Sequence, residues 1–166
     1  MTQTTVRELD IELPEYQVKA IVRLFPQAAP TLTDLVWEAL ETPLEGPTGH
    51  AAFNGEELFV FLPPFRRDGE IVVPPVEAWT VWPKPGDLMF FYKRPDERVP
   101  GGTDPIYELC FMYGETDLRH FYEKGQAGSL IGHMSVGHVE FADACRQTRI
   151  RGRTTIRVSR RAAGPS

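Results

Sequence analysis

The stretch Ile106–Gly114 reads Ile-Tyr-Glu-Leu-Cys-Phe-Met-Tyr-Gly. Aromatic and aliphatic residues follow one another without the polar alternation of a half-exposed strand, so the stretch predicts a β-strand that is buried on both faces. Glu108 is the one acidic residue in it. Because a buried carboxylate is costly unless a donor or a cation meets it, Glu108 either points outward at the rim of a barrel or faces a pocket that supplies partners.

Strand patterns also lie before and after this stretch. They are Val18–Phe25, His50–Phe53, Glu57–Leu62, Glu77–Val81, Leu88–Tyr92, Met134–Glu140 and Thr154–Val158. Helical spacing of apolar residues predicts one helix over Pro30–Leu40, and a shorter helix is expected near Phe141–Gln147. Strands and helices do not alternate as in a parallel α/β fold. We therefore predict a mainly β protein, a closed antiparallel barrel of about eight strands with two helices over its open ends.

Length and composition set the remaining bounds. A chain of 166 residues suits one domain, and we expect a polar lead-in over residues 1–16, a single barrel over 17–158 and a polar tail over 159–166. The formal net charge of −5 argues against a nucleic-acid surface. No apolar run is long enough for a membrane span, and the N-terminus lacks the apolar core of a signal peptide. We therefore expect a cytoplasmic protein.

The order of several short motifs resembles that of a known fold. Ala28-Ala29-Pro30 before a helix, and the turn Pro85–Leu88 into a buried strand, resemble the cyclophilin pattern. The chain is more similar still to a bacterial group of uncharacterised cyclophilin-like proteins, domain-of-unknown-function family 3830. The motifs that carry this resemblance are Gly49-His50-Ala51 with Gly55-Glu56, Trp82–Asp87, Glu108 with Tyr113-Gly114, and Gly132-His133. The resemblance implies a cyclophilin-like barrel over about residues 17–158.

The chain departs from these families at two places. Cyclophilins carry a catalytic arginine in a Phe-His-Arg segment and then a Gln-Gly-Gly motif, and the corresponding region His50–Leu62 has neither. A fixed cation that stabilises the twisted imide is thus missing, and we expect prolyl isomerase activity to be absent or very weak. The second departure is Gly132-His133-Met134, which stands where the uncharacterised family has Gly-Asn-His.

Four residues are the candidate ligand-binding set. His50 and Glu108 would be the polar anchors at a barrel mouth, with Tyr113 and His133 in support. Tyr113 lies five residues after Glu108, so strict alternation places their side chains on opposite faces unless a bulge intervenes. Glu77 is a further residue that would line the same mouth.

Other titratable residues are expected to be structural. Glu56 and Glu57 follow the turn signal Asn54-Gly55 and are interpreted as a solvated turn tip. Cys110 and Cys145 are expected to be reduced core thiols rather than a disulfide or metal ligands. No local histidine or cysteine pair has metal-ligand spacing, so neither a metal nor a cofactor is predicted.

Three functions remain open from the sequence. The first is a barrel that binds or processes a small polar organic molecule. The second is a vestigial prolyl isomerase or a binder of proline-containing peptides, and the third is a non-catalytic oligomeric scaffold. We expect a small-molecule ligand, no nucleic-acid or membrane partner, and a homo-oligomer that uses the loops Phe65–Val76 and Lys93–Pro105.

Overall fold

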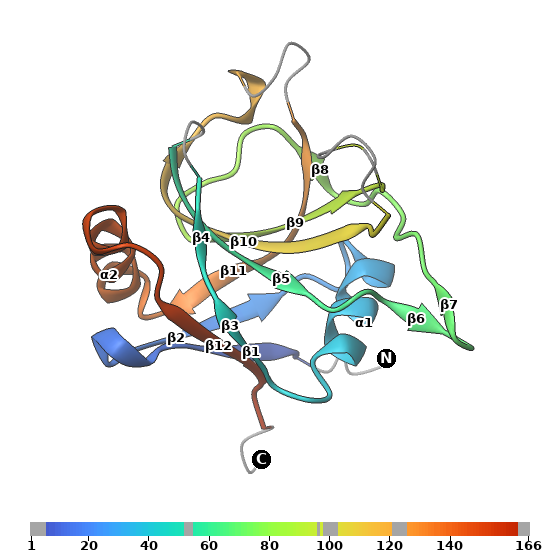
Figure 1. Ribbon diagram of the computed structural model, residues 1–166, viewed down its shortest axis with the longest axis horizontal. Helices are drawn as coiled ribbons and strands as arrows, with labels where there is room; N and C mark the ends of the chain where they lie inside the picture. Colours follow the sequence, from blue (N-terminus) through green and yellow to red (C-terminus); the bar gives the residue numbers. More distant parts are fainter. Residues whose placement is uncertain (1–5, 52–54, 96, 98–102, 121–125, 163–166) are drawn as a thin grey trace.

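The computed structural model describes residues 6–51, 55–95, 97, 103–120 and 126–162. Ten strands form one sheet: β1 (Glu8–Leu13), β2 (Val18–Leu24), β3 (Leu44–Pro47), β4 (Gly49–His50), β5 (Gly55–Leu62), β8 (Trp79–Thr80), β9 (Asp87–Lys93), β10 (Ile106–Thr116), β11 (Gly128–Val136) and β12 (Thr155–Arg160). Their order is β3-β12-β1-β2-β11-β9-β10-β5-β4, and β8 pairs beside this path with β11. All pairs are antiparallel (Figure 1).

The two ends of this sheet are joined by one segment of chain. β3 pairs with β12, β4 pairs with β5, and only Thr48 separates β3 from β4. The Thr48 hydroxyl donates to the carbonyl oxygen of Thr154 at 3.1 Å and accepts from the backbone N–H of Thr154 at 3.2 Å. This crossing makes the sheet a nearly closed barrel, as predicted, with nine strands in its path rather than about eight.

The barrel begins earlier in the chain than expected. Glu8–Leu13 lies within the stretch interpreted as a polar lead-in, but it forms β1 and pairs with both β2 and β12. Leu9, Ile11 and Leu13 are fully buried while the acids between them are partly exposed. The alternation of acidic and apolar residues has the two-residue period of a half-buried strand, and this signal outweighs the polar composition. β12 likewise continues to Arg160, past the expected end of the domain at 158.

Helix α1 (Pro30–Ala39) covers one side of the barrel (Figure 1). The carboxylate of Glu77 accepts hydrogen bonds from the backbone N–H groups of Thr31 at 3.2 Å and Leu32 at 2.9 Å. These are two of the N–H groups that a helix leaves unpaired at its first turn. Glu77 therefore caps α1 from 45 residues away along the chain and does not serve a pocket mouth.

Helix α2 (His138–Arg151) is longer than α1, with 14 residues against 10, whereas the sequence predicted a shorter one. It starts directly after Gly137 and ends directly before Gly152, and both glycines have positive φ angles, 78° and 94°. Phe141, Ala144 and Cys145 face the barrel core, so the apolar face spans more turns than the expected segment. Neither helix in the described part of the chain has the length and apolar character of a membrane span.

Strand β10 is buried on both faces, which confirms the prediction from its sequence. Its inner face carries Tyr107, Leu109, Phe111 and Tyr113, which belong to the large core between the barrel and the two helices. Its outer face carries Cys110 and Met112 and packs in a second, smaller core. That core contains Met89, Phe91 and Leu118, with Phe59, Val81 and Leu130 at its margin.

The cover of the outer face comes from segments that are distant in sequence. Leu118 begins the 3-10 turn η2 (Leu118–His120), and its backbone N–H donates to the Val81 carbonyl at 3.1 Å. A separate hairpin of β6 (Arg66–Arg67) and β7 (Glu70–Ile71) projects from the barrel (Figure 1). Asn54, and part of the loop expected over Lys93–Pro105, lie outside the described residues.

Candidate functional site

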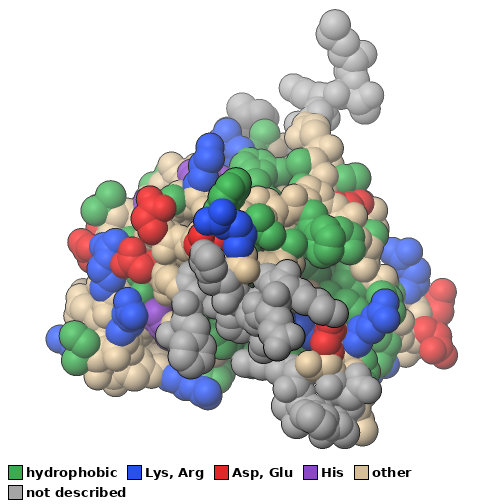
Figure 2. All heavy atoms as spheres, turned by 90° about the horizontal axis from the view of Figure 1, so that it is seen from above, with side chains coloured by type: hydrophobic (Ala, Val, Ile, Leu, Met, Phe, Trp, Pro, Cys, Tyr) green, Lys and Arg blue, Asp and Glu red, His purple; other side chains and the backbone are tan. Residues whose placement is uncertain are grey.

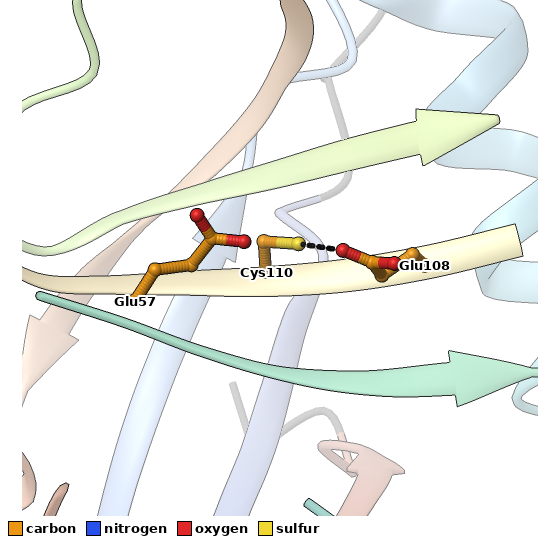
Figure 3. Close-up of side chains that lie close together, drawn as sticks. All are labelled: Glu57, Glu108 and Cys110. Atoms are coloured by element: carbon orange, nitrogen blue, oxygen red, sulfur yellow. Dashed lines mark hydrogen bonds between the residues drawn. The ribbon is translucent and has the colours of Figure 1, made fainter. Parts of the chain in front are cut away.

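Glu57, Glu108 and Cys110 converge on the outer face of β10 and β5 (Figure 3). In the strand register, Glu57 lies opposite Met112, so Cys110 is its diagonal neighbour and Glu108 is two residues further along β10. One oxygen of each carboxylate and the Cys110 sulfur all lie within 4.8 Å of one another. We call these three side chains the acid–thiol cluster.

The structure corrects the interpretation of Glu57 that its sequence position suggested. It is not part of a solvated turn tip, because only 4% of the residue is exposed. Its atom Oε2 has no hydrogen-bond partner among the described residues. The pKa of Glu57 is raised from 4.5 to about 7, mainly by burial and to a smaller extent by the neighbouring Glu108 carboxylate. A hydrogen bond from Cys110 and the positive charge of Lys93 offset part of this rise in pKa.

Glu108 is also buried, with 5% of the residue exposed. The Cys110 thiol donates to Glu108 Oε1 at 2.9 Å. Of the two alternatives for Glu108, the structure therefore shows a buried carboxylate with partners rather than a rim residue. Cys110 and Cys145 are both free and buried. Burial raises the pKa of the Cys110 thiol well above its usual value, so the sulfur carries its proton at neutral pH.

The cluster combines groups that can bind a cation, accept a hydrogen-bond donor or exchange a proton. Its paired neighbours in the strand register, Phe59, Met89, Phe91 and Met112, are apolar, while Lys93 of β9 supplies a positive charge that acts on Glu57. In such surroundings an interaction with a carboxylate is stronger than it is in water. The sequence reasoning found Glu108 but missed Glu57 and Cys110. The signal that would have found them is the register, because two acids on adjacent strands gain significance only once those strands are paired.

The predicted residues His50 and Tyr113 lie together, on the other side of the sheet from Glu108. His50 Nδ1–H donates to the Ala51 carbonyl at 2.8 Å, and its Nε2 accepts from the Tyr113 hydroxyl. Burial lowers the pKa of His50 and raises the pKa of Tyr113 to about 12, so both groups are neutral. Tyr113 belongs to the inner core, so the alternation argument placed it correctly relative to Glu108.

A cleft of about 310 Å³ lies beside His50, and its lining residues are Thr48, His50, Ala51, Thr148, Arg149, Gly152 and Arg153. Both ring nitrogens of His50 are already hydrogen-bonded within the protein, so the ring has no free donor or acceptor for a ligand in this cleft. The His50–Tyr113 pair therefore has the properties of a structural contact between β4 and β10.

His133 occupies a third location. Its Nδ1–H donates to Asp87 Oδ1 at 2.8 Å, and Asp87 Oδ2 accepts from the backbone N–H of Lys84 at 2.7 Å. The ring packs on Gly86, which has a φ angle of 94°, and a Cβ atom there would lie 2.7 Å from His133 Cε1. The turn before β9 thus fixes His133, which contacts Asp87 rather than the acid–thiol cluster or His50.

The surface above the outer core has no dominant sign of charge. Figure 2 views the molecule from this side, and lysine, arginine and acidic side chains lie among hydrophobic ones on the visible face. Among the described residues, the visible part of this face carries no continuous patch of one charge.

Comparison with solved structures identifies the architecture. The structure of McbB in complex with tryptophan matches with a TM-score of 0.58 and 15% identity over 95% of this chain, which spans about half of McbB (46%). The hypothetical protein AF2241 from Archaeoglobus fulgidus matches with a TM-score of 0.56 and 14% identity, covering 96% of this chain and 98% of that protein. The Mimivirus cyclophilin matches with a TM-score of 0.51 and 16% identity, covering 96% and 89%. At these identities the matches establish a cyclophilin-like fold and nothing further.

Comparison by sequence matches one family model, described below, and no curated protein. A family model described as "Protein of unknown function (DUF3830)" matches residues 11–160, which include nearly all of the barrel. The chain belongs to this family of uncharacterised cyclophilin-like proteins.

Proposed function

We propose that the protein binds a small polar organic molecule at the acid–thiol cluster, through a positively charged or hydrogen-bond-donating group of the ligand. The observation that carries this proposal is Oε2 of Glu57, which is buried and has no hydrogen-bond partner in the part of the chain that the structure describes. A buried carboxylate oxygen without a donor costs free energy in the folded protein, on the order of 1–3 kcal/mol. A ligand that donates to this oxygen recovers that cost on binding.

The proposed site keeps Glu108 but excludes the two histidines that the sequence favoured. His50 has both ring nitrogens paired, and His133 is held by Asp87. Glu108 remains in the site, with Glu57 and Cys110 as its neighbours in place of the histidines. The carboxylates supply recognition, while the aromatic rings of Phe59 and Phe91 supply apolar contact for the rest of the ligand.

One structural neighbour indicates a class of compound to test. McbB was solved with tryptophan, an amino acid that combines an amino group with an aromatic ring. The acid–thiol cluster and its aromatic neighbours have matching features, so amines and amino acids with aromatic groups are the first compounds to examine.

The test is a thermal-shift screen of the metal-free protein in the presence of a chelator. The panel contains tryptophan, tryptamine, smaller amines, amides and carboxylates of matched size. We expect amines or amino acids to raise the melting temperature of the wild type, and matched carboxylates to have no effect. Glu57→Gln and Glu108→Gln keep the shape of the site but remove its charge, and both should abolish the shift.

Glu70→Gln is the matched control, because Glu70 is exposed on the projecting hairpin. His50→Ala is the second comparison, since it removes the anchor that the sequence favoured. Both variants should keep the wild-type response. A compound that stabilises the wild type and the Glu57 and Glu108 variants equally would show that the site lies elsewhere.

A separate observation favours assembly into at least a dimer, which we also propose. Ile71, Val73 and Val76 are 42%, 63% and 64% exposed in and after the projecting hairpin. They lie in or beside the loop that the sequence identified as adhesive, and exposed apolar patches are common at contacts between protein copies. Light scattering should give a mass of at least twice the 18.8 kDa of one chain. A mass of one chain at working concentration would contradict assembly.

A further inference from the structure

We propose that Glu57, Glu108 and Cys110 together bind one divalent, thiol-seeking metal ion of the zinc type. This inference deepens the proposed function, because it concerns the same three side chains, and it rests on that function only for the location of the site. It adds an inorganic component that the sequence did not predict, since Cys110 was expected to be a core thiol and no metal site was expected.

The first support is geometric. The three donors come from two adjacent, paired strands, β5 and β10, so the backbone holds them in place before an ion arrives. Their donor atoms lie within 4.8 Å of one another. Two ligands of one tetrahedral zinc ion, each about 2.0–2.3 Å from it, lie about 3.5 Å apart. The donors are thus close enough to converge on a single ion after small shifts of the side chains.

The second support is the unpartnered oxygen. Glu57 is 4% exposed, its carboxylate lies on the side of Cys110, and Oε2 has no hydrogen-bond partner among the described residues (Figure 3). Acidic clusters at protein surfaces are common without an ion, because water satisfies their oxygens. This one is buried, with Glu57, Glu108 and Cys110 exposed by 4%, 5% and 0%, so the unpaired oxygen is not open to bulk water.

The chemistry of the donors selects the type of ion. A thiolate favours zinc and its neighbours, and carboxylates at about 2.0–2.2 Å complete common zinc sites. Calcium and magnesium prefer oxygen ligands alone, so a site with sulfur in a set of three discriminates against them. On binding, the ion replaces the proton that Cys110 now donates to Glu108, and this proton leaves to solvent.

Three protein ligands leave a further coordination position open. Structural zinc sites usually have four protein ligands, whereas catalytic sites have three and a position for water or substrate. With the ion bound, a lone-pair donor of an organic molecule, such as a carboxylate or a neutral amine, would occupy this open position in place of the cationic group that binds the metal-free cluster. In this way the metal adds a second means by which the site recognises a polar group.

The test uses cobalt(II) as a spectroscopic substitute for zinc. The protein is stripped with a chelator, kept reduced, and titrated with cobalt(II) without any organic compound. We expect one equivalent to bind with a thiolate-to-cobalt charge-transfer absorption in the near ultraviolet, and zinc to displace it. Calcium and magnesium should not displace it.

Matched variants locate the ion. Cys110→Ser should abolish the charge-transfer band, while Cys145→Ser should keep it, because Cys145 is the other buried free thiol and lies in α2. Glu57→Gln and Glu108→Gln should each weaken cobalt binding by at least about 100-fold. Replacing a residue that only orients a metal ligand already lowers metal affinity by up to about that factor. Circular dichroism checks that each variant is folded, and the Glu57 and Glu108 variants suffice if Cys110→Ser does not fold.

Absence of the band in the wild type, or its persistence in Cys110→Ser, would overturn the metal site. The organic screen is run with chelator, so its outcome is separate. Binding of an amine without any cobalt band would retain the proposed function and remove the metal. A cobalt band without any organic hit would support the metal and count against the organic ligand.

Discussion

The two faces of strand β10 differ in how well the buried polar atoms around them are hydrogen-bonded. On the inner face, Leu109 and Phe111 pack in the large core, and the Tyr107 hydroxyl donates to the Val72 carbonyl at 2.7 Å. On the outer face, Glu108 and Cys110 are as deeply buried, but they share their small core with a carboxylate oxygen that has no donor among the described residues. Side chains on both faces are thus buried, but only the outer core contains a buried carboxylate oxygen for which the described residues supply no donor.

This difference separates stability from function within one strand. The inner face follows the rule that buried groups are apolar or hydrogen-bonded, and its contribution is to hold the barrel together. Within the described ranges of the chain, the outer face violates that rule at Glu57 Oε2, and such violations in a folded protein call for an explanation. An occupant that is bound in solution provides one.

The largest expected effect is on the inner face. Phe111 is 1% exposed and its ring packs on Phe141 of α2 with centroids 5.7 Å apart. Phe111→Ala removes this contact and leaves a cavity, so we expect a loss of about 3–5 kcal/mol in the free energy of unfolding. Denaturation in urea measures it. A loss below about 1 kcal/mol would mean that the inner face is not the main core.

The next effect is the contribution of Glu57 to the free energy of unfolding, which depends on pH. Its pKa is raised from 4.5 to about 7, so the folded protein holds this proton more tightly than the unfolded chain between those pH values. Stability from this group is present below pH 4.5 and is lost as pH rises to about 7. Over this range the free energy of unfolding falls by about 3 kcal/mol in total, or about 1.4 kcal/mol for each pH unit.

We therefore compare the free energy of unfolding of Glu57→Gln with that of the wild type, both without metal. The difference should favour the variant more at pH 8 than at pH 4.5. Urea denaturation at several pH values, with chelator present, measures this difference. Glu70→Gln, on the exposed hairpin, serves as the reference and should follow the wild type. A Glu57→Gln variant that is equally destabilised at all pH values would contradict the uncompensated burial of this carboxylate.

A smaller effect tests whether the His50–Tyr113 pair is structural. Tyr113→Phe removes the hydroxyl that donates to His50 Nε2, and we expect a loss of about 1 kcal/mol. A double-mutant cycle with His50→Ala should give a coupling energy of similar size, while ligand binding at the outer face remains unchanged. Loss of ligand binding in either variant would place the functional site on the inner side after all.

The smallest effect concerns the helix cap. Glu77→Gln weakens the hydrogen bonds to the N–H groups of Thr31 and Leu32 and removes the negative charge at the start of α1. We expect a loss of about 0.3–1 kcal/mol. A thermal melt of the variant measures it, and binding at the acid–thiol cluster should not change. If Glu77→Gln abolished binding with the stability intact, Glu77 would belong to the site, as the sequence first indicated.

The sequence predicted the barrel because periodicity and turn residues are local. The apolar run of β10 and the helix that begins at Pro30 were both identified from neighbours in the chain. The same local signal was available for β1, where acids and apolar residues alternate over Glu8–Leu13. The error there came from giving composition more weight than period.

The site was harder to predict because it depends on pairing between strands. Glu57 follows a turn in the sequence, and only its position opposite Met112 brings it beside Cys110. The small core that contains Cys110 also includes Leu118 and, at its margin, Val81, which come from two other segments. No local pattern encodes such a cover. The histidines attracted attention by residue type, yet their hydrogen bonds to Ala51 and Asp87 satisfy them within the fold.

One measurement tests the division between the two faces directly: the affinity and the stability of Phe111→Ala and Glu57→Gln, determined on the same samples. The affinity probe is cobalt(II) and, in parallel with chelator, the amine from the screen that stabilises the wild type most. We predict that Phe111→Ala is strongly destabilised but binds like the wild type at a temperature where it is folded, while Glu57→Gln is as stable or more stable at pH 8 and does not bind. If affinity and stability fell together in both variants, the outer face would be part of the core and not a binding site.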